Sequence, residues 1–168
     1  YGESEIQTPA IDELAREGVV FDNAVTPMPE TAPAHAAMFT GIHPVRTGVL
    51  SNGHALRTRY KTLAERLEAE GYATAAFVSS FAVDSRTGLD QGFQAYDDDF
   101  FVGVRGLSGI RLASYGLRAL MRWGDPLKFR SLLERDGEET LGRAVSWLRD
   151  HGQRPFFMWV HLFEPHAP

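Results

Sequence analysis

The sequence has no cysteine among its 168 residues. Disulfides, thiolate metal sites and a cysteine nucleophile are therefore excluded within this chain. It also has no run of about 20 apolar residues of the kind that a membrane-spanning helix needs. The net charge is −5, so the sequence lacks the basic excess of a nucleic-acid-binding surface, and we expect no nucleic-acid partner.

The overall composition is that of a folded domain. Apolar residues make up 43% and charged residues 23% of the chain, which is close to the average of globular proteins. A chain of this length suits one domain or a large part of one. The first and last residues, 1–5 and 164–168, both resemble loops from the middle of a protein. We therefore expect a single domain, 1–168, that is incomplete at both ends.

Helix and strand signals alternate along the chain. Helices are predicted from Thr8–Pro9 to Gly18, over 33–40, from a capping box at Thr62 and Glu65 to Gly71, and over 138–151. Buried strands are predicted over 72–78 and 155–162, and a short strand over 19–25. This order predicts an α/β fold with a mainly parallel central sheet flanked by helices.

Two segments interrupt this alternation. Residues 84–100 are rich in Gly and Asp, and Asp97, Asp98 and Asp99 are more typical of a solvated acidic loop than of a calcium site. Over about 101–135, arginines alternate with leucines, which predicts one or two amphipathic helices forming an insertion or lid. Such a basic face could line an anionic substrate or touch a membrane, although a solvated helix face is the commoner case.

The segment from Pro29 to Gly41 carries the clearest chemical signal. Thr31 stands at the start of a short predicted helix, with Pro33 in its first turn. The free N–H groups and the positive end of a helix form an anion site. A Thr hydroxyl is a weak nucleophile that needs a base or a metal for activation. A helix N-cap is the alternative role of Thr31, and it is the more frequent one for threonine.

Several segments in this order resemble the sulfatase family of the alkaline phosphatase superfamily. The frame Thr31-x-Pro33-Ala34-His35, followed by Thr40-Gly41, is similar to the sulfatase signature Cys/Ser-x-Pro-Ser-Arg-x-x-x-x-Thr-Gly. Further similar segments are 8–15, 18–24, 62–67, 71–74, 88–93, 155–157 and 165–168. The resemblance covers nearly the whole chain outside 101–135 and implies an alkaline-phosphatase-like fold.

Two positions depart from the sulfatase pattern. Sulfatases carry a Cys or Ser that becomes formylglycine where this chain has Thr31, and an Arg where it has His35. The Thr-x-Pro-x-His form is similar to phosphodiesterases of the nucleotide pyrophosphatase type and to a branch of bacterial sulfatase-like proteins. In those relatives an unmodified Thr is the nucleophile and a metal ligand, which favours phosphorus esters as substrates.

The resemblance also implies roles for Asn52 and His166, and local position suggests roles for His35 and His161. Asn52 would donate its amide to an oxygen of the bound ester, or form an Asn-Gly turn, or both. His166 would assist the leaving oxygen, unless it is only an exposed loop residue. His35 could orient the loop that carries Thr31. His161, inside a predicted strand, is expected to be a core histidine with satisfied hydrogen bonds.

A divalent metal, calcium or zinc, is the implied cofactor. Of its ligands only Thr31 falls in this chain. The resemblance places an Asp pair upstream of Tyr1 and an Asp-His or Asp-Asn pair beyond Pro168. The family's sulfatases hold calcium through oxygen ligands, and the Thr-type phosphodiesterases hold two zinc ions through Asp and His.

The expected function is a metal-dependent hydrolase of sulfate or phosphate esters with a covalent intermediate on Thr31. Its substrate would be an anionic ester of a small molecule, glycan or lipid. Two alternatives stay open: a transferase of a phospho-substituent such as phosphoethanolamine, and a non-catalytic binding module. The resemblance implies a periplasmic, secreted or membrane-anchored full-length protein, and an inactive chain when residues 1–168 stand alone.

Overall fold

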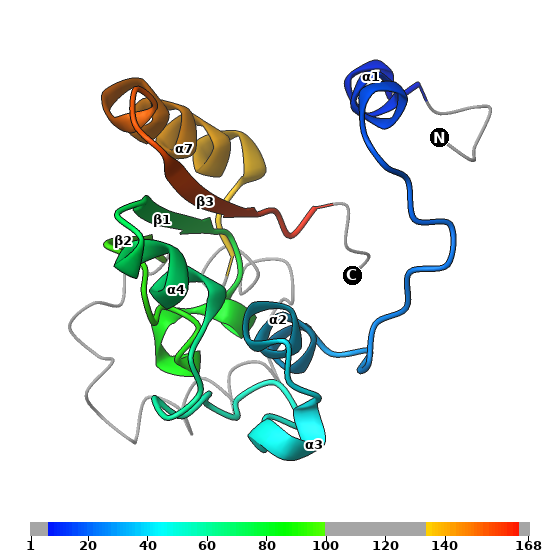
Figure 1. Ribbon diagram of the computed structural model, residues 1–168, viewed down its shortest axis with the longest axis vertical. Helices are drawn as coiled ribbons and strands as arrows, with labels where there is room; N and C mark the ends of the chain where they lie inside the picture. Colours follow the sequence, from blue (N-terminus) through cyan, green and yellow to red (C-terminus); the bar gives the residue numbers. More distant parts are fainter. Residues whose placement is uncertain (1–6, 100–133, 165–168) are drawn as a thin grey trace, which may run out of the picture.

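A computed structural model describes residues 7–99 and 134–164 (Figure 1). Its helices are α1 (Pro9–Glu17), α2 (Thr31–Thr40), α3 (Pro44–Thr47), α4 (Leu63–Ala69) and α7 (Gly137–His151), and its strands are β1 (Ala73–Val78), β2 (Ala95–Asp97) and β3 (Phe156–His161). Two short 3-10 helices, η1 (Phe81–Val83) and η2 (Ser85–Thr87), follow β1. The predicted helices and the strands predicted over 72–78 and 155–162 are therefore present, with small shifts at their ends. β1 is buried as predicted, but β3 is half-buried rather than buried, and β2 lies where the sequence predicted only a loop over 84–100.

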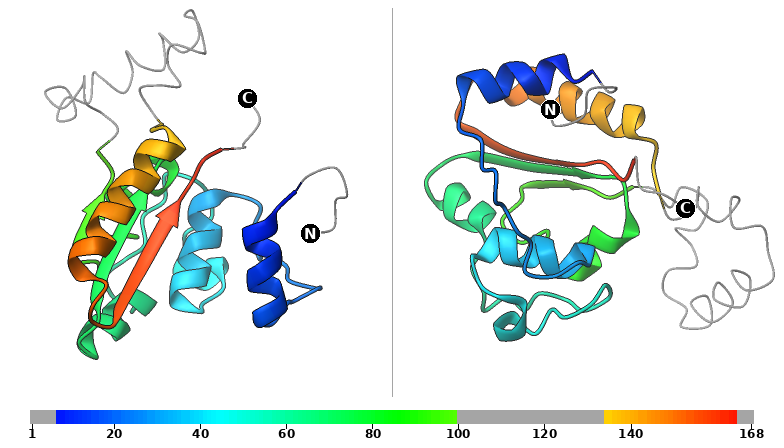
Figure 2. Two further views of the ribbon diagram at one scale, coloured as in Figure 1. Left: turned by 90° about the horizontal axis from the view of Figure 1, so that it is seen from above. Right: turned by 90° about the vertical axis from the view of Figure 1, so that its right-hand side faces the viewer.

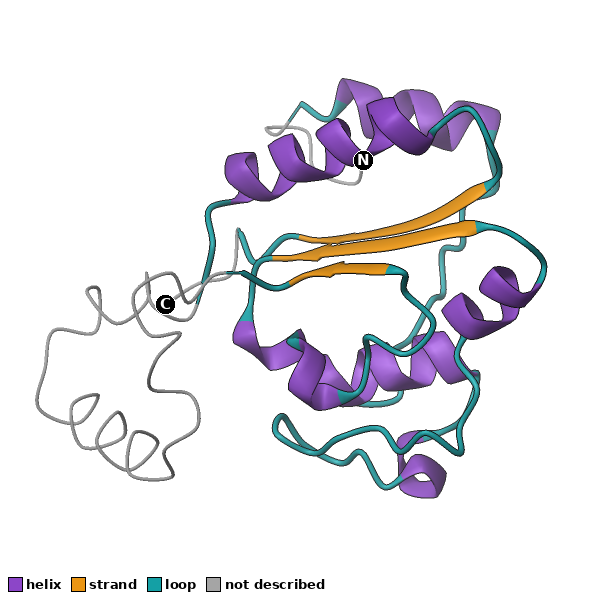
Figure 3. Cartoon of the chain, turned by 90° about the vertical axis from the view of Figure 1, so that its left-hand side faces the viewer, coloured by secondary structure: helices purple, strands orange, loops and turns teal. Residues whose placement is uncertain are grey.

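The three strands form one parallel sheet in the order β2-β1-β3. The central strand β1 is buried along its whole length, as expected for a strand with a neighbour on each side and helices on both faces. Figure 3 shows the sheet between α7 on one face and α2 and α4 on the other. The predicted class, a parallel sheet flanked by helices, is confirmed.

Side chains of β1 alternate between two core clusters. Val78 packs with Phe39 of α2 in the cluster on one face. Ala75 and Phe77 pack with Ala144 of α7 in the cluster on the other. Side chains that alternate along a strand point to opposite faces of the sheet, so β1 contributes to both core clusters. Val78, the last residue of β1, therefore anchors α2 against the sheet.

The capping box predicted for α4 is confirmed. The Thr62 hydroxyl accepts a hydrogen bond from the Glu65 backbone N–H at 3.1 Å, and the Glu65 carboxylate accepts one from the Thr62 N–H at 2.9 Å. Gly92 passes so close to this turn that an added Cβ would lie 2.1 Å from the Glu65 nitrogen. Only glycine fits at this contact, where its φ is +85°.

The strand predicted over 19–25 is wrong. These residues form no strand in the structure, and Val19 and Val25 are 80% and 93% exposed. Figure 2 shows segment 18–30 running from α1 past the edge of the sheet to α2. An apolar run becomes a strand only if a neighbouring strand pairs with it. In the described sheet β2 and β3 each pair with β1, and residues 19–25 pair with none of the three.

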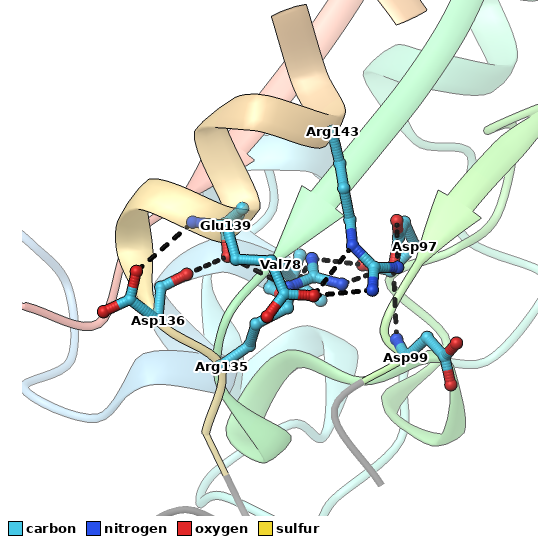
Figure 4. Close-up of polar contacts among 8 residues, drawn as sticks. Val78, Asp97, Asp99, Arg135, Asp136, Glu139 and Arg143 are labelled. Carbon is cyan, nitrogen blue, oxygen red and sulfur yellow. Dashed lines mark hydrogen bonds and ion pairs between the residues drawn. The ribbon is translucent and has the colours of Figure 1, made fainter. Parts of the chain in front are cut away.

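The expectation of a solvated acidic loop is wrong at Asp97, which ends β2 and accepts hydrogen bonds from two arginines (Figure 4). The Arg135 Nη1 lies 2.6 Å from Asp97 Oδ1, and the Arg143 Nη1 lies 3.1 Å from Oδ2. Burial favours the protonated acid, but the hydrogen bond and charge of Arg135, joined by Arg143, hold the pKa of Asp97 below its usual value. Asp97 is therefore a structural ion-pair residue.

Arg135, the last residue of the basic segment predicted at about 101–135, is buried. Its side chain is 2% exposed and also donates to the Val78 carbonyl at 3.0 Å and to the Thr140 hydroxyl at 3.0 Å. A buried guanidinium with several acceptors is part of the core. Residues 100–133 lie outside the described part of the chain.

Candidate active site

Thr31 is the first residue of α2, and Glu30 occupies the N-cap position. The Thr31 hydroxyl has no hydrogen-bond partner among the described residues, so it does not act as the cap of its own helix. The N-cap alternative is therefore not what the structure shows. A half-buried hydroxyl is instead left at the positive end of a ten-residue helix.

Asn52 is attached to the same helix start. Its Oδ1 accepts a hydrogen bond from the Ala32 backbone N–H at 2.9 Å, and its own backbone N–H donates to Glu30 Oε2 at 2.8 Å. Gly53 follows in a turn with φ +97°, so the predicted Asn-Gly turn is also present. Asn52 therefore contacts both sequence neighbours of Thr31, Glu30 and Ala32.

The hydrogen bond from Ala32 also fixes the orientation of the Asn52 amide. A backbone N–H can only donate, so the atom that it contacts is the side-chain oxygen. The Asn52 NH₂ group is not used in this contact, and it donates to no residue in the part of the chain that the structure describes. An amide donor with a fixed plane next to a free hydroxyl is suited to bind an anionic oxygen.

His35 lies one turn further along α2. Its Nδ1 is 2.8 Å from the Thr31 carbonyl oxygen, so Nδ1 carries the hydrogen and Nε2 is the acceptor of the neutral ring. Burial lowers the pKa of His35, partly opposed by this hydrogen bond. The ring also packs on Trp159, with centroids 5.1 Å apart. A neutral, immobilised imidazole therefore holds the first turn of α2 from inside.

His161 is not the satisfied core histidine that the sequence predicts. It ends β3, its ring lies 5.3 Å from that of His35, and its Nδ1 is buried without a hydrogen-bond partner among the described residues. Burial and then the neighbouring His35 lower the pKa of His161 to about 4. The available signal was its place at the end of a parallel strand, where α/β proteins bind ligands.

The remaining predicted site residue, His166, lies outside the described residues. Within 7–99 and 134–164, no group of three or more His, Asp or Glu side chains is placed to hold a metal. Thr31 is thus the one predicted ligand that these ranges contain. None of the described helices is long and apolar enough to cross a bilayer.

Comparison with known proteins identifies the family. The sulfatase family model matches residues 1–168. This chain belongs to the sulfatase family. It is 29% identical, over its whole length, to an uncharacterized sulfatase of Escherichia coli, of which it covers 35%. Over 97% of its length it is 26% identical to a multifunctional alkaline phosphatase superfamily protein of Trinickia caryophylli, of which it covers 37%.

Another sulfatase and one solved structure agree with this assignment. The sulfatase chain is 40% identical to an ulvan-active sulfatase of Formosa agariphila over 44% of its own length, and covers 14% of that protein. A crystal structure of the phosphonate monoester hydrolase of Agrobacterium radiobacter superposes with a TM-score of 0.66 at 19% identity, over 99% of this chain and 38% of that one. This likeness shows the alkaline-phosphatase-like fold. The chain spans about a third of the length of the two relatives that match it over nearly its whole length.

Proposed function

We propose that this chain carries the nucleophile of a metal-dependent hydrolase of sulfate or phosphate esters, and that the nucleophile is Thr31. The observation that supports this most directly is the unpartnered Thr31 hydroxyl at the start of α2, with the Asn52 side chain tied to the next backbone N–H. The Thr31 hydroxyl, the positive end of α2 and the Asn52 side chain all lie at the first turn of this helix, where they would act together on a bound ester. The names of the relatives, which include sulfatases and a phosphonate monoester hydrolase, support the same reaction class.

The proposed reaction has two displacements. The Thr31 hydroxyl gives up its hydrogen to solvent, and its oxygen forms a bond to sulfur or phosphorus while the bond to the leaving-group oxygen breaks. Protonated His166 supplies a proton to that leaving oxygen. Water then attacks the same sulfur or phosphorus and returns a proton to His166, while the bond to the Thr31 oxygen breaks and releases Thr31. The Asn52 amide and the N–H groups of α2 donate to the nonbridging oxygens, where negative charge increases in each transition state.

A divalent metal, calcium or zinc, is part of this proposal, and Thr31 is its proposed ligand in this chain. The Thr31 hydroxyl is free to coordinate, and ligands from elsewhere in the full-length protein would complete the shell, since the described residues hold no group of three. The bound metal would supply the Lewis acidity that activates the hydroxyl near neutral pH. His35 would keep the Thr31 carbonyl, and with it the start of α2, in place.

We further propose a phosphorus ester as the preferred substrate, because Thr31 cannot become formylglycine. The alcohol part would be a small molecule, glycan or lipid, and the full-length protein would be periplasmic, secreted or membrane-anchored. We retain a helical insertion or lid at about 101–135 as part of the proposal. Asp97 before this segment and Arg135 at its end are joined by an ion pair, as an insertion with adjacent ends requires.

The test compares turnover of aryl phosphate, phosphodiester and aryl sulfate substrates by the full-length protein and its variants. Thr31→Ala should reduce kcat by about 10³-fold or more, because it removes the attacking oxygen. Thr58→Ala, on an exposed surface, is the matched control and should leave kcat unchanged. Equal turnover by Thr31→Ala and wild type would exclude Thr31 as the nucleophile.

A further inference from the structure

A cavity of about 600 Å³ lies between α3 and the segment that follows Asn52. Arg46, Arg57 and Arg59 line it, together with His54 and the backbone of Gly53. Its volume is within the range of small-molecule sites, roughly 300 to 1,000 Å³. No lining residue is acidic. The cavity therefore offers hydrogen-bond donors and positive charge to anything that enters it.

The charge of this cavity is uncompensated. Arg46, Arg57 and Arg59 are exposed and form no ion pair with any acidic residue in the described ranges. Elsewhere in the structure Arg135 and Arg143 are paired with Asp97. In a chain with a net charge of −5, three unpaired guanidinium groups around one cavity are a local concentration of positive charge, which attracts anions.

Hydrogen bonds hold parts of the cavity wall in place. The Arg59 Nη2 donates to the Tyr60 hydroxyl at 2.8 Å, and that hydroxyl donates to the Arg46 carbonyl, so the two walls are joined. The His54 Nδ1 accepts a hydrogen bond from the Leu50 N–H at 3.1 Å. Since Nδ1 accepts this hydrogen bond, the His54 ring carries a hydrogen on Nε2, which can donate to an anion.

The cavity begins one residue from the proposed active site. Gly53 directly follows Asn52, whose side chain is bonded to Ala32 beside Thr31. Consecutive Cα atoms are about 3.8 Å apart. A substrate whose ester is held at Thr31 and Asn52 can therefore place a neighbouring group against the cavity wall without a long spacer.

We propose that this cavity binds a second anionic group of the substrate, a sulfate, phosphate or carboxylate outside the ester that is cleaved. The inference rests on the proposed function for its position and names the substrate class: esters that carry more than one negative charge. Planar guanidinium groups pair with such oxygens in a bidentate manner. Arg57 is the residue to test, because Arg59 and Arg46 also take part in the wall contacts with Tyr60.

The experiment measures binding of a heparin tetrasaccharide to the full-length protein by titration calorimetry. The Thr31→Ala variant is used as background, so that no turnover is needed. Arg57→Gln should weaken binding about fivefold to tenfold, Arg57→Lys should weaken it less, and higher salt should weaken it in the parent. Arg149→Gln, on the exposed side of α7, is the matched control and should bind like the parent.

Three results would overturn the proposal. They are absence of binding by the parent, equal binding by Arg57→Gln and Arg149→Gln, and equal affinity for an unsulfated tetrasaccharide. Because the readout is binding, it is separate from the kinetic test of Thr31. Binding that depends on Arg57 in a protein without ester hydrolysis would refute the proposed reaction while keeping the anion site. Hydrolysis without such binding would do the reverse.

Discussion

At the scale of single residues, Asn52 connects two segments that are far apart in sequence. Its contact with Ala32 spans 20 positions and uses the side-chain oxygen, while the amide nitrogen stays available. Asn52→Ala in the full-length protein should reduce kcat by about 10²- to 10³-fold, with little change in KM, because the donor acts mainly on the transition state. Steady-state kinetics on the best ester substrate measures this.

Asn52→Asp is the informative partner variant. It keeps the oxygen that accepts from Ala32 and replaces the amide donor by a second oxygen, which repels the ester. A loss of kcat as large as that of Asn52→Ala is expected. Retained kcat in Asn52→Asp together with loss in Asn52→Ala would mean that only the contact with Ala32 matters, and that the donor role is wrong.

The buried pair of His35 and His161 should make stability depend on pH. The folded pKa of His161, about 4, lies below its unfolded value near 6.5, so acid favours the unfolded state, which takes up the proton first. Stability should be highest above about pH 6.5 and should fall from there toward pH 4, by at most about 1.4 kcal/mol per pH unit for each histidine. Urea unfolding at several pH values measures the slope.

Replacing the titrating ring gives the control. His161→Phe removes the buried Nδ1 and should flatten the slope between pH 6.5 and 4, while the exposed His43→Gln should leave it as in the parent. A slope that His161→Phe does not change would show that His161 is not the source. The pairing of these rings could not be predicted from the sequence, because the order of residues does not show that α2 packs against β3.

At the scale of elements, the local signals predicted the structure well. The capping box of α4 and the apolar run of β1 depend on residues close together in sequence, and both are present. The run at 19–25 failed because apolar character does not reveal whether a partner strand exists. The prediction that Asp97 lies in a solvated loop was wrong for a similar reason. Its partner Arg135 lies 38 positions away, and nothing near Asp97 in the sequence indicates the ion pair.

The same ion pair leads to a stability prediction. Arg135→Ala should lower the free energy of unfolding by about 3 kcal/mol, because it leaves the Val78 carbonyl and the Asp97 carboxylate without their buried donor. Arg135→Lys should recover only part of this loss, since one ammonium cannot reproduce the guanidinium fork. Guanidinium chloride unfolding, with Arg149→Ala as an exposed control, measures the difference. Equal midpoints for Arg135→Ala and Arg149→Ala would contradict it.

At the scale of the whole molecule, the family and the fold could be predicted from separated motifs in the right order. The position of Thr31 at the helix start followed from the same motifs. The substrate could not be predicted, because the arginines of the cavity between α3 and the segment after Asn52 belong to no recognisable motif. They gather only when α3 and that segment fold against each other.

Residues 1–168 should be inactive as an isolated protein. The chain covers 35% of the Escherichia coli sulfatase that it matches over its whole length, and its described residues hold no group of three metal-binding side chains. Purified alone, it should hydrolyse none of the test esters, and added zinc or calcium should not restore activity. The full-length protein should be active and should lose activity with a chelator. If residues 1–168 alone hydrolysed an ester and Thr31→Ala abolished that activity, Thr31 would need no metal ligands from outside this chain.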